Sequence, residues 1–176
     1  SNLSLRGCSA TSGAIDLSQL SRLKTVDVRQ TKLSDVTLPA SHVLSSVFLP
    51  ATISSVDVEN QENLSVLQLE GYGNLTRFVV KNNKRIDTFA QATALLAAKP
   101  SGLKTVTLTD LAWNTQGRQC NMDLLMYLAS LKANLTGIIF MLAATSDRAL
   151  SLADKETLCA LYGNIDSTVN ALYIKY

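Results

Sequence analysis

The hydrophobic positions in the first half of the chain follow a short repeat. Pairs of apolar residues separated by one residue occur eight times, and each pair begins 9 to 12 positions after the start of the one before it. The pairs are Leu3/Leu5, Ile15/Leu17, Val26/Val28, Val36/Leu38, Val47/Leu49, Val56/Val58, Leu67/Leu69 and Phe78/Val80. Residues i and i+2 of a strand point the same way. Each pair therefore predicts a short strand with one buried side.

The segments between the pairs distinguish a coil from a hairpin meander. Tight hairpins favour dipeptides such as Asn-Gly, and none occurs in the breaks "RQTK", "PASHV" or "ENQEN". Two consecutive units make a turn of 20 to 23 residues, which lies within the range of leucine-rich repeats. We therefore predict a coil in which two sets of short strands alternate.

The consensus L-x-x-L-x-L-x-x-N/C-x-L can be tested on these turns. "LKTVDVRQTKL" fits with Thr31 in the Asn/Cys slot, "LTRFVVKNNKRI" with Asn83, and "LSLRGC" with Cys8. The slot favours a small side chain that packs inward beside backbone groups left unpaired by the turn. Tyr72 and Leu111 occupy equivalent slots and do not match. The repeat is therefore degenerate.

Beyond Val80 the period lengthens. Strand signals continue at 103–108, 135–140 and 170–176. Counted from Phe78, the successive steps from one strand to the next are 28, 32 and 34 residues. Each gap contains a helix candidate. The expected helices are 88–99, capped by Asp87; 122–133, capped by Asn121; and one with a capping box at Ser151 and Asp154 that stops at Gly163.

These patterns predict an α/β fold, a leucine-rich repeat solenoid. Short two-strand turns form its N-terminal half and strand-helix turns form its C-terminal half. We expect one domain over residues 1–176. Its first repeat shows no cap, so we expect it to be a fragment of a larger protein.

Three phrases carry a family resemblance: "LSSVFLP", "LSVLQLEGYGNLTRF" and "LKTVTLTDLAWN". They resemble the irregular leucine-rich repeats of surface proteins from gut Bacteroidetes, some of which are prophage-encoded tail proteins. The resemblance implies a non-catalytic module for protein-protein or adhesion contacts, located extracellularly or at the cell surface, or on a phage virion. A spacer domain of such a protein is the alternative.

A binding surface on such a coil would lie where outward side chains form rows across the strands. We expect the strands at Val36, Val56, Phe78, Val106 and Ile138 to form this face. Its candidate binding residues are Asp35, Thr37, Asp57, Glu59, Arg77, Lys81, Lys104, Thr107 and Thr109, with Val79 in the same rows. This mixed polar set predicts a protein or surface-glycan partner. It offers no aromatic platform for stacking sugars.

Composition excludes several classes of partner. The chain has 176 residues, 17% charged, and a net charge of +2, which is far below the balance expected of a nucleic-acid binder. The longest apolar run, 137–144, is too short to span a membrane. No Cys-x-x-Cys spacing indicates a metal site, and no phosphate-binding loop indicates a nucleotide cofactor. We expect no metal and no cofactor.

Catalytic chemistry has few candidates. The only histidine, His42, lies in a turn, where we expect it to be solvated. A parallel β-helix carbohydrate enzyme would need two facing carboxylates. Asp27 and Asp57 belong to alternate strand sets, so we expect them on opposite sides of the coil. We therefore expect no enzyme, and keep the carbohydrate enzyme as a less favoured alternative.

Three other features have structural interpretations. The basic run 81–85 predicts a solvated turn between a strand and a helix. The sequons at Asn2, Asn63, Asn74 and Asn134 predict an asparagine required by the turn before each repeat leucine. Trp113 is interpreted as an inward-facing filler at a widened turn, with a rim residue for a ligand as the alternative.

Overall fold

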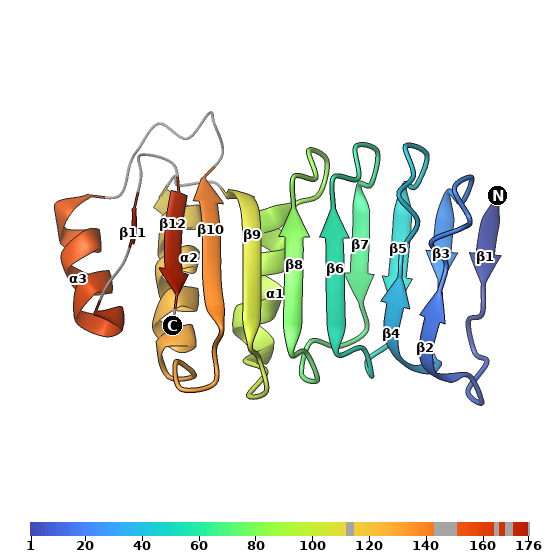
Figure 1. Cartoon of the computed structure of the whole chain (residues 1–176), viewed down its shortest axis with the longest axis horizontal. Coiled ribbons are helices and arrows are strands. Elements are labelled where there is room, and N and C mark those ends of the chain that lie inside the picture. The colour runs from blue at the N-terminus through green and yellow to red at the C-terminus, as the bar shows by residue number, and fades with distance from the viewer. Residues whose placement is uncertain (112–114, 143–150, 164–165, 168–170, 176) are drawn as a thin grey trace.

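Successive short strands wind the chain into a coil with parallel strands, an α/β solenoid (Figure 1). The computed structural model describes residues 1–111, 115–142, 151–163, 166–167 and 171–175. The elements in chain order are β1 (Asn2–Ser4), β2 (Ser12–Asp16), β3 (Thr25–Asp27), β4 (Lys32–Thr37), β5 (Ser46–Leu49), β6 (Ser55–Glu59), β7 (Val66–Leu69), β8 (Arg77–Lys81), α1 (Thr88–Ala98), β9 (Thr105–Leu111), α2 (Thr115–Ala129), β10 (Gly137–Leu142), α3 (Leu152–Tyr162), β11 (Asp166–Ser167) and β12 (Ala171–Lys175).

The two alternating strand sets are confirmed. One set forms the sheet β1-β3-β5-β7, in which Leu3, Val26, Val47 and Leu67 pair in register. The other set forms β2-β4 and the larger sheet β11-β12-β10-β9-β8-β6. There the register rows are Ile15/Val36 and Val56/Phe78/Val106/Ile138. The apolar pairs of the repeat thus stack turn on turn along one continuous core.

Helices α1 and α2 take the place of strands on the side of the sheet β1-β3-β5-β7. In Figure 1, α1 lies behind β8 and β9, and α2 lies behind β12 and β10. At the junction, the buried Gln91 of α1 donates its Nε2–H to the Leu67 carbonyl of edge strand β7, at 2.8 Å. The Tyr72 hydroxyl donates to Gln91 Oε1, also at 2.8 Å. A side-chain amide therefore satisfies the strand edge where the coil changes from strand to helix.

The first and third helix predictions are confirmed. Asp87 caps α1 by accepting from the Ala90 N–H. Ser151 and Asp154 form the capping box of α3, and Gly163 is its C-cap. The bounds predicted for the second helix are wrong, because α2 runs from Thr115 to Ala129. Asn121 lies within it and is buried, so packing overrides the weak helix propensity of asparagine.

The last strand departs from the coil. The strand signal at 170–176 is confirmed by β12, but β12 runs antiparallel to β10. Strand β11 in turn pairs antiparallel with β12. A further turn of the coil would have added a parallel strand. The side-chain period that identified β12 carries no information on strand direction.

Several turns that follow strands share one backbone device. Positive φ angles occur at Gly7, Gln30, Asn60, Asn82 and Asp110. Each of these residues directly precedes a slot position. The slot residues Thr31, Gln61, Asn83 and Leu111 are buried, whereas Cys8 is exposed. Asparagine, aspartate and glycine tolerate this left-handed conformation better than most residues. At the four buried slots, the next side chain therefore turns inward directly after a residue with positive φ.

A ladder of hydroxyl groups joins the coils where their strands begin. Six Ser or Thr side chains each donate to the carbonyl of the equivalent residue one turn earlier, at 3.0 to 3.4 Å. The donors are Ser34, Ser45, Ser54, Ser65, Thr76 and Thr136. The signal was visible in the sequence, because each donor directly follows the first apolar residue of its repeat. The pairwise reading of apolar positions missed it.

Candidate functional site

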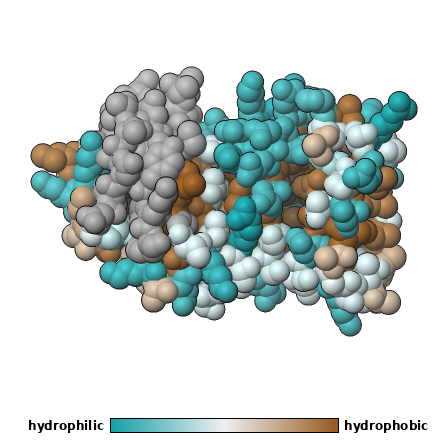
Figure 2. All heavy atoms as spheres, in the orientation of Figure 1, coloured by the Kyte–Doolittle hydropathy of each residue, from teal (hydrophilic) through white to brown (hydrophobic). Residues whose placement is uncertain are grey.

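The candidate binding face is the open side of strands β4, β6, β8, β9 and β10, opposite the helices. The predicted strand set therefore forms one side of the molecule. Figure 2 shows this face, with hydrophilic residues gathered over β6 and β8. Strand β4 packs beside β6 without joining its hydrogen-bonded sheet. Asp35 and Thr37 on β4 are partly buried and exposed, respectively, and Lys104, just before β9, is exposed.

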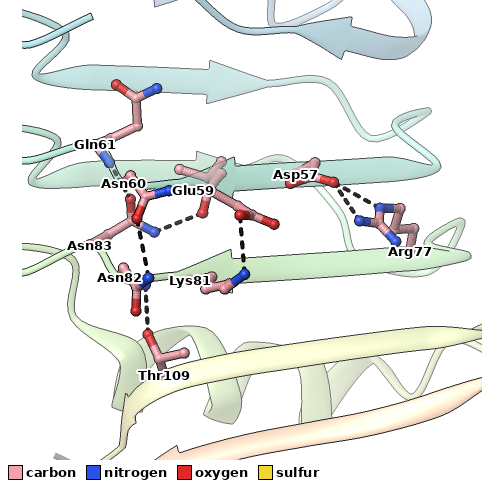
Figure 3. A network of polar contacts seen from close by, with 10 residues as sticks. Asp57, Glu59, Asn60, Gln61, Arg77, Lys81, Asn82, Asn83 and Thr109 are labelled. Atoms are coloured by element: carbon pink, nitrogen blue, oxygen red, sulfur yellow. Dashed lines mark hydrogen bonds and ion pairs between the residues drawn. The ribbon is translucent and has the colours of Figure 1, made fainter. Parts of the chain in front are cut away.

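Two ion pairs occupy the centre of this face (Figure 3). Arg77 donates through Nε and Nη2 to Asp57 Oδ2, at 2.9 and 2.6 Å. Lys81 Nζ lies 3.4 Å from Glu59 Oε2. Glu59 and Lys81 are direct register partners on β6 and β8, whereas Arg77 reaches diagonally to Asp57. Four of the predicted binding residues therefore neutralise one another across two strands.

The candidates Thr107 and Thr109 need correction. Their side chains were expected to be available to a partner, but the residues are only 6% and 3% exposed. The Thr109 hydroxyl accepts the Asn82 N–H at 2.7 Å and donates to an Asp110 carboxylate oxygen at 3.0 Å. An outward strand position is not the same as an exposed one, because neighbouring groups can cover it. Thr109 orders the corner of the coil.

Val79 was also expected among the outward positions of the face, and it too is buried. It is in register with Asp57 and Thr107 in the middle row of the face, and it is 2% exposed. The row therefore changes from charged at β6 to covered at β8 and β9. Of the predicted binding residues, those that a partner can touch are the two ion pairs, Asp35, Thr37 and Lys104.

Asp27 lies on the opposite side of the coil from Asp57, as predicted, because β3 and β6 belong to different sheets. Arg29 binds Asp27 through both carboxylate oxygens, at 2.9 and 2.6 Å. These hydrogen bonds hold the pKa of Asp27 below its ordinary value. The Arg29 guanidinium also lies 4.4 Å from the centre of the Phe48 ring. Asp27 is thus part of an ion pair on the other face.

His42 is exposed, as predicted, with Nδ1 3.5 Å from Glu62 Oε2. Among the residues with described positions, no three His, Cys, Asp or Glu side chains gather in a way that could hold a metal ion. The three cysteines are free thiols. In the described part of the chain, no helix has the length and apolar character needed to cross a membrane.

The polar residues of the turns contact the preceding coil. The side-chain amide of Asn74 donates to the Ala51 carbonyl at 2.9 Å, and that of Asn63 donates to the His42 carbonyl. These two sequons therefore contain the turn asparagines that were predicted. Trp113 lies outside the described residues. In the basic run, Asn83 is buried, whereas Lys84 and Arg85 are exposed.

The slot residues differ in how well they match the prediction. Thr31 is buried and donates to the Val28 carbonyl at 2.8 Å. Asn83 is 2% exposed, donates to the Val58 carbonyl at 2.8 Å and accepts the Gln61 N–H at 2.9 Å. Cys8 is exposed, which contradicts an inward slot at this first turn. Leu111 is buried as an apolar occupant of its slot.

Gln61 is a buried slot residue that the repeat alignment missed. It follows Asn60 as Asn83 follows Asn82, and the dipeptides Asn-Gln and Asn-Asn were the available signal.

Comparison with family models, with curated proteins and with solved structures gave no match to this chain.

Proposed function

We propose that this domain is a non-catalytic, leucine-rich repeat type of interaction module that binds a protein or surface-glycan partner on its open strand face. One observation carries the proposal. Among the described residues, no helix covers the outer side of strands β4, β6, β8, β9 and β10, while α1, α2 and the sheet β1-β3-β5-β7 lie on the opposite side of the coil (Figure 1). Aligned strands offer a rigid array of side chains on which a partner can dock.

The slot asparagine supports the leucine-rich repeat assignment. Asn83 links two coils through both ends of its amide, and it occupies the Asn/Cys position of the consensus. The same family resemblance supports a bacterial origin and an extracellular or cell-surface location, with a phage virion as the alternative location.

The pairing of charges on the face favours a second candidate, a structural spacer. Asp57 and Glu59 are already bound to Arg77 and Lys81. A partner would have to compete with these contacts or recognise them as pairs. In a spacer, these ion pairs would only have to stabilise the stacking of the strands.

Binding by face-directed variants separates the two functions. The purified domain is applied to arrays of mucin, fibronectin, collagen and bacterial polysaccharides. The Arg77→Glu/Lys81→Glu variant changes the face, and Arg22→Glu/Lys24→Glu is the matched control with the same change of net charge. Both control residues are exposed beside the sheet β1-β3-β5-β7.

If the domain is an interaction module, at least one probe should retain the wild-type domain and the control variant, and the same probe should not retain the face variant. Equal retention of all three proteins would contradict the assignment of the face. If no probe retains the wild-type domain, the spacer is favoured.

A further inference from the structure

A column of buried polar side chains runs through the corner that follows strands β4, β6 and β8. Ser41, Gln61 and Asn83 occupy it, and each is at least 93% buried. Gln61 stands between its neighbours. Its Nε2 donates to the Pro39 carbonyl of the preceding turn at 2.9 Å. Its backbone N–H donates to Asn83 Oδ1 at 2.9 Å (Figure 3).

The other end of the same amide lacks a protein partner. Gln61 Oε1 is buried, and no protein donor lies within hydrogen-bonding reach of it; it is the one such side-chain atom among the described residues. Asn83, by contrast, uses both ends of its amide. The Gln61 side chain is one methylene longer and extends to Pro39, where only its nitrogen is paired.

The chemistry of the unpaired atom defines its ligand. A carbonyl oxygen accepts hydrogen bonds, so the ligand must be a donor. A cation would require several oxygen ligands and would be costly to bury without a counter-charge. Pro39 O and Asn83 Oδ1 each already accept one hydrogen bond. A small neutral donor remains, and buried polar groups of this kind are commonly paired with ordered water.

We propose that Gln61 binds an internal water molecule. The water donates one hydrogen bond to Gln61 Oε1 and the other to the second lone pair of Pro39 O, which the same amide already contacts. The site connects the turn after β4 to the slot after β6. It does not depend on the proposed binding function, because it lies in the interior of the coil.

A crystal structure at atomic resolution and NMR exchange spectroscopy test the site on the unmodified domain. The expected results are an ordered water within hydrogen-bonding distance of Gln61 Oε1 and cross-relaxation between a long-lived water and the Gln61 side-chain NH2. An Oε1 that has neither the water density nor this cross-relaxation would overturn the proposal.

The variant Gln61→Met provides a second test, with Gln68→Met on the exposed surface of β7 as the control. A hydrated amide predicts that Gln61→Met loses the water signal and lowers Tm, while the control leaves both unchanged. Tm alone does not separate a hydrated from a dry amide, because methionine also removes the hydrogen bond from Nε2 to the buried Pro39 carbonyl in both cases. A water signal that is absent from the wild type, or that persists in Gln61→Met, would therefore contradict the water site.

Discussion

The amide of Asn83 provides the sharpest test of how the coils are joined. The variant Asn83→Ala removes the donor to the Val58 carbonyl and the acceptor of the Gln61 N–H, both of which lie in a buried region. Each buried backbone group left unpaired costs roughly 1–3 kcal/mol, so the free energy of unfolding should fall by about 2–6 kcal/mol. Domains have about 5–15 kcal/mol in total, so the loss is a large share of stability.

Urea titration followed by far-UV circular dichroism measures the change. The midpoint should fall while the slope with denaturant stays constant, since the fold is kept. Asn74→Ala is the matched control, because its amide makes one bond to a preceding carbonyl but is exposed. Its cost should stay within about 1 kcal/mol, since water can replace the lost donor. Equal midpoints for the two variants would refute the account of the slot.

Three further predictions concern the core, an ion pair and the hydroxyl ladder. Val56→Asp buries an unpaired charge at a position that is 2% exposed, so the cooperative thermal transition should be lost; an unchanged Tm would contradict the inward position. Burial raises the pKa of Asp154, but hydrogen bonds from Arg118 and Ser151 outweigh it and hold the pKa below its ordinary value. The stability from this carboxylate is therefore complete above its unfolded pKa of about 3.9 and is lost as pH falls through the lower folded value. Calorimetry should show a shallower fall of Tm below about pH 4 for Asp154→Asn than for the wild type, and equal slopes would contradict the pairing. Ser54→Ala removes the bond to the Ser34 carbonyl and should cost about 1 kcal/mol in urea titration; a variant as stable as the wild type would remove the ladder from the account.

The strand sets could be predicted because their signal is strong and local. Val26, Val47 and Val56 recur with an apolar partner two residues on, and all three are buried in the register that the spacing predicted. The capping box at Ser151 was equally local. Such signals depend only on residues that are close in sequence, so they can be recognised without knowledge of the fold.

The exposure of the candidate face could not be predicted in the same way. The alternation of β9 places Thr107 and Thr109 outward, but the neighbouring chain determines whether an outward residue meets solvent. The pairing of Asp57 with Arg77 also depends on the register of two strands 20 residues apart. The sequence pattern predicted which strands form the candidate face. Its ion pairs and the burial of its threonines could be seen only in the structure.

The direction of β12 and the start of α2 were missed for other reasons. A period of two identifies a strand in either direction, so β12 could not be recognised as antiparallel. Asn121 has the residue type of a helix cap but lies buried inside α2. Local preference is a weak guide where packing selects the outcome.

Lysine labelling of the domain with a bound partner tests the central claim most directly. Lys81 and Lys104 belong to the candidate binding face, and Lys24 lies beside the sheet on the opposite side. The partner is a probe retained by the wild-type domain on the arrays, and acetylation at each lysine is read by mass spectrometry with and without it. The account predicts reduced acetylation of Lys81 and Lys104 and unchanged acetylation of Lys24. Protection of Lys24 with no change at Lys81 and Lys104 would contradict the assignment of the open strand face as the binding surface.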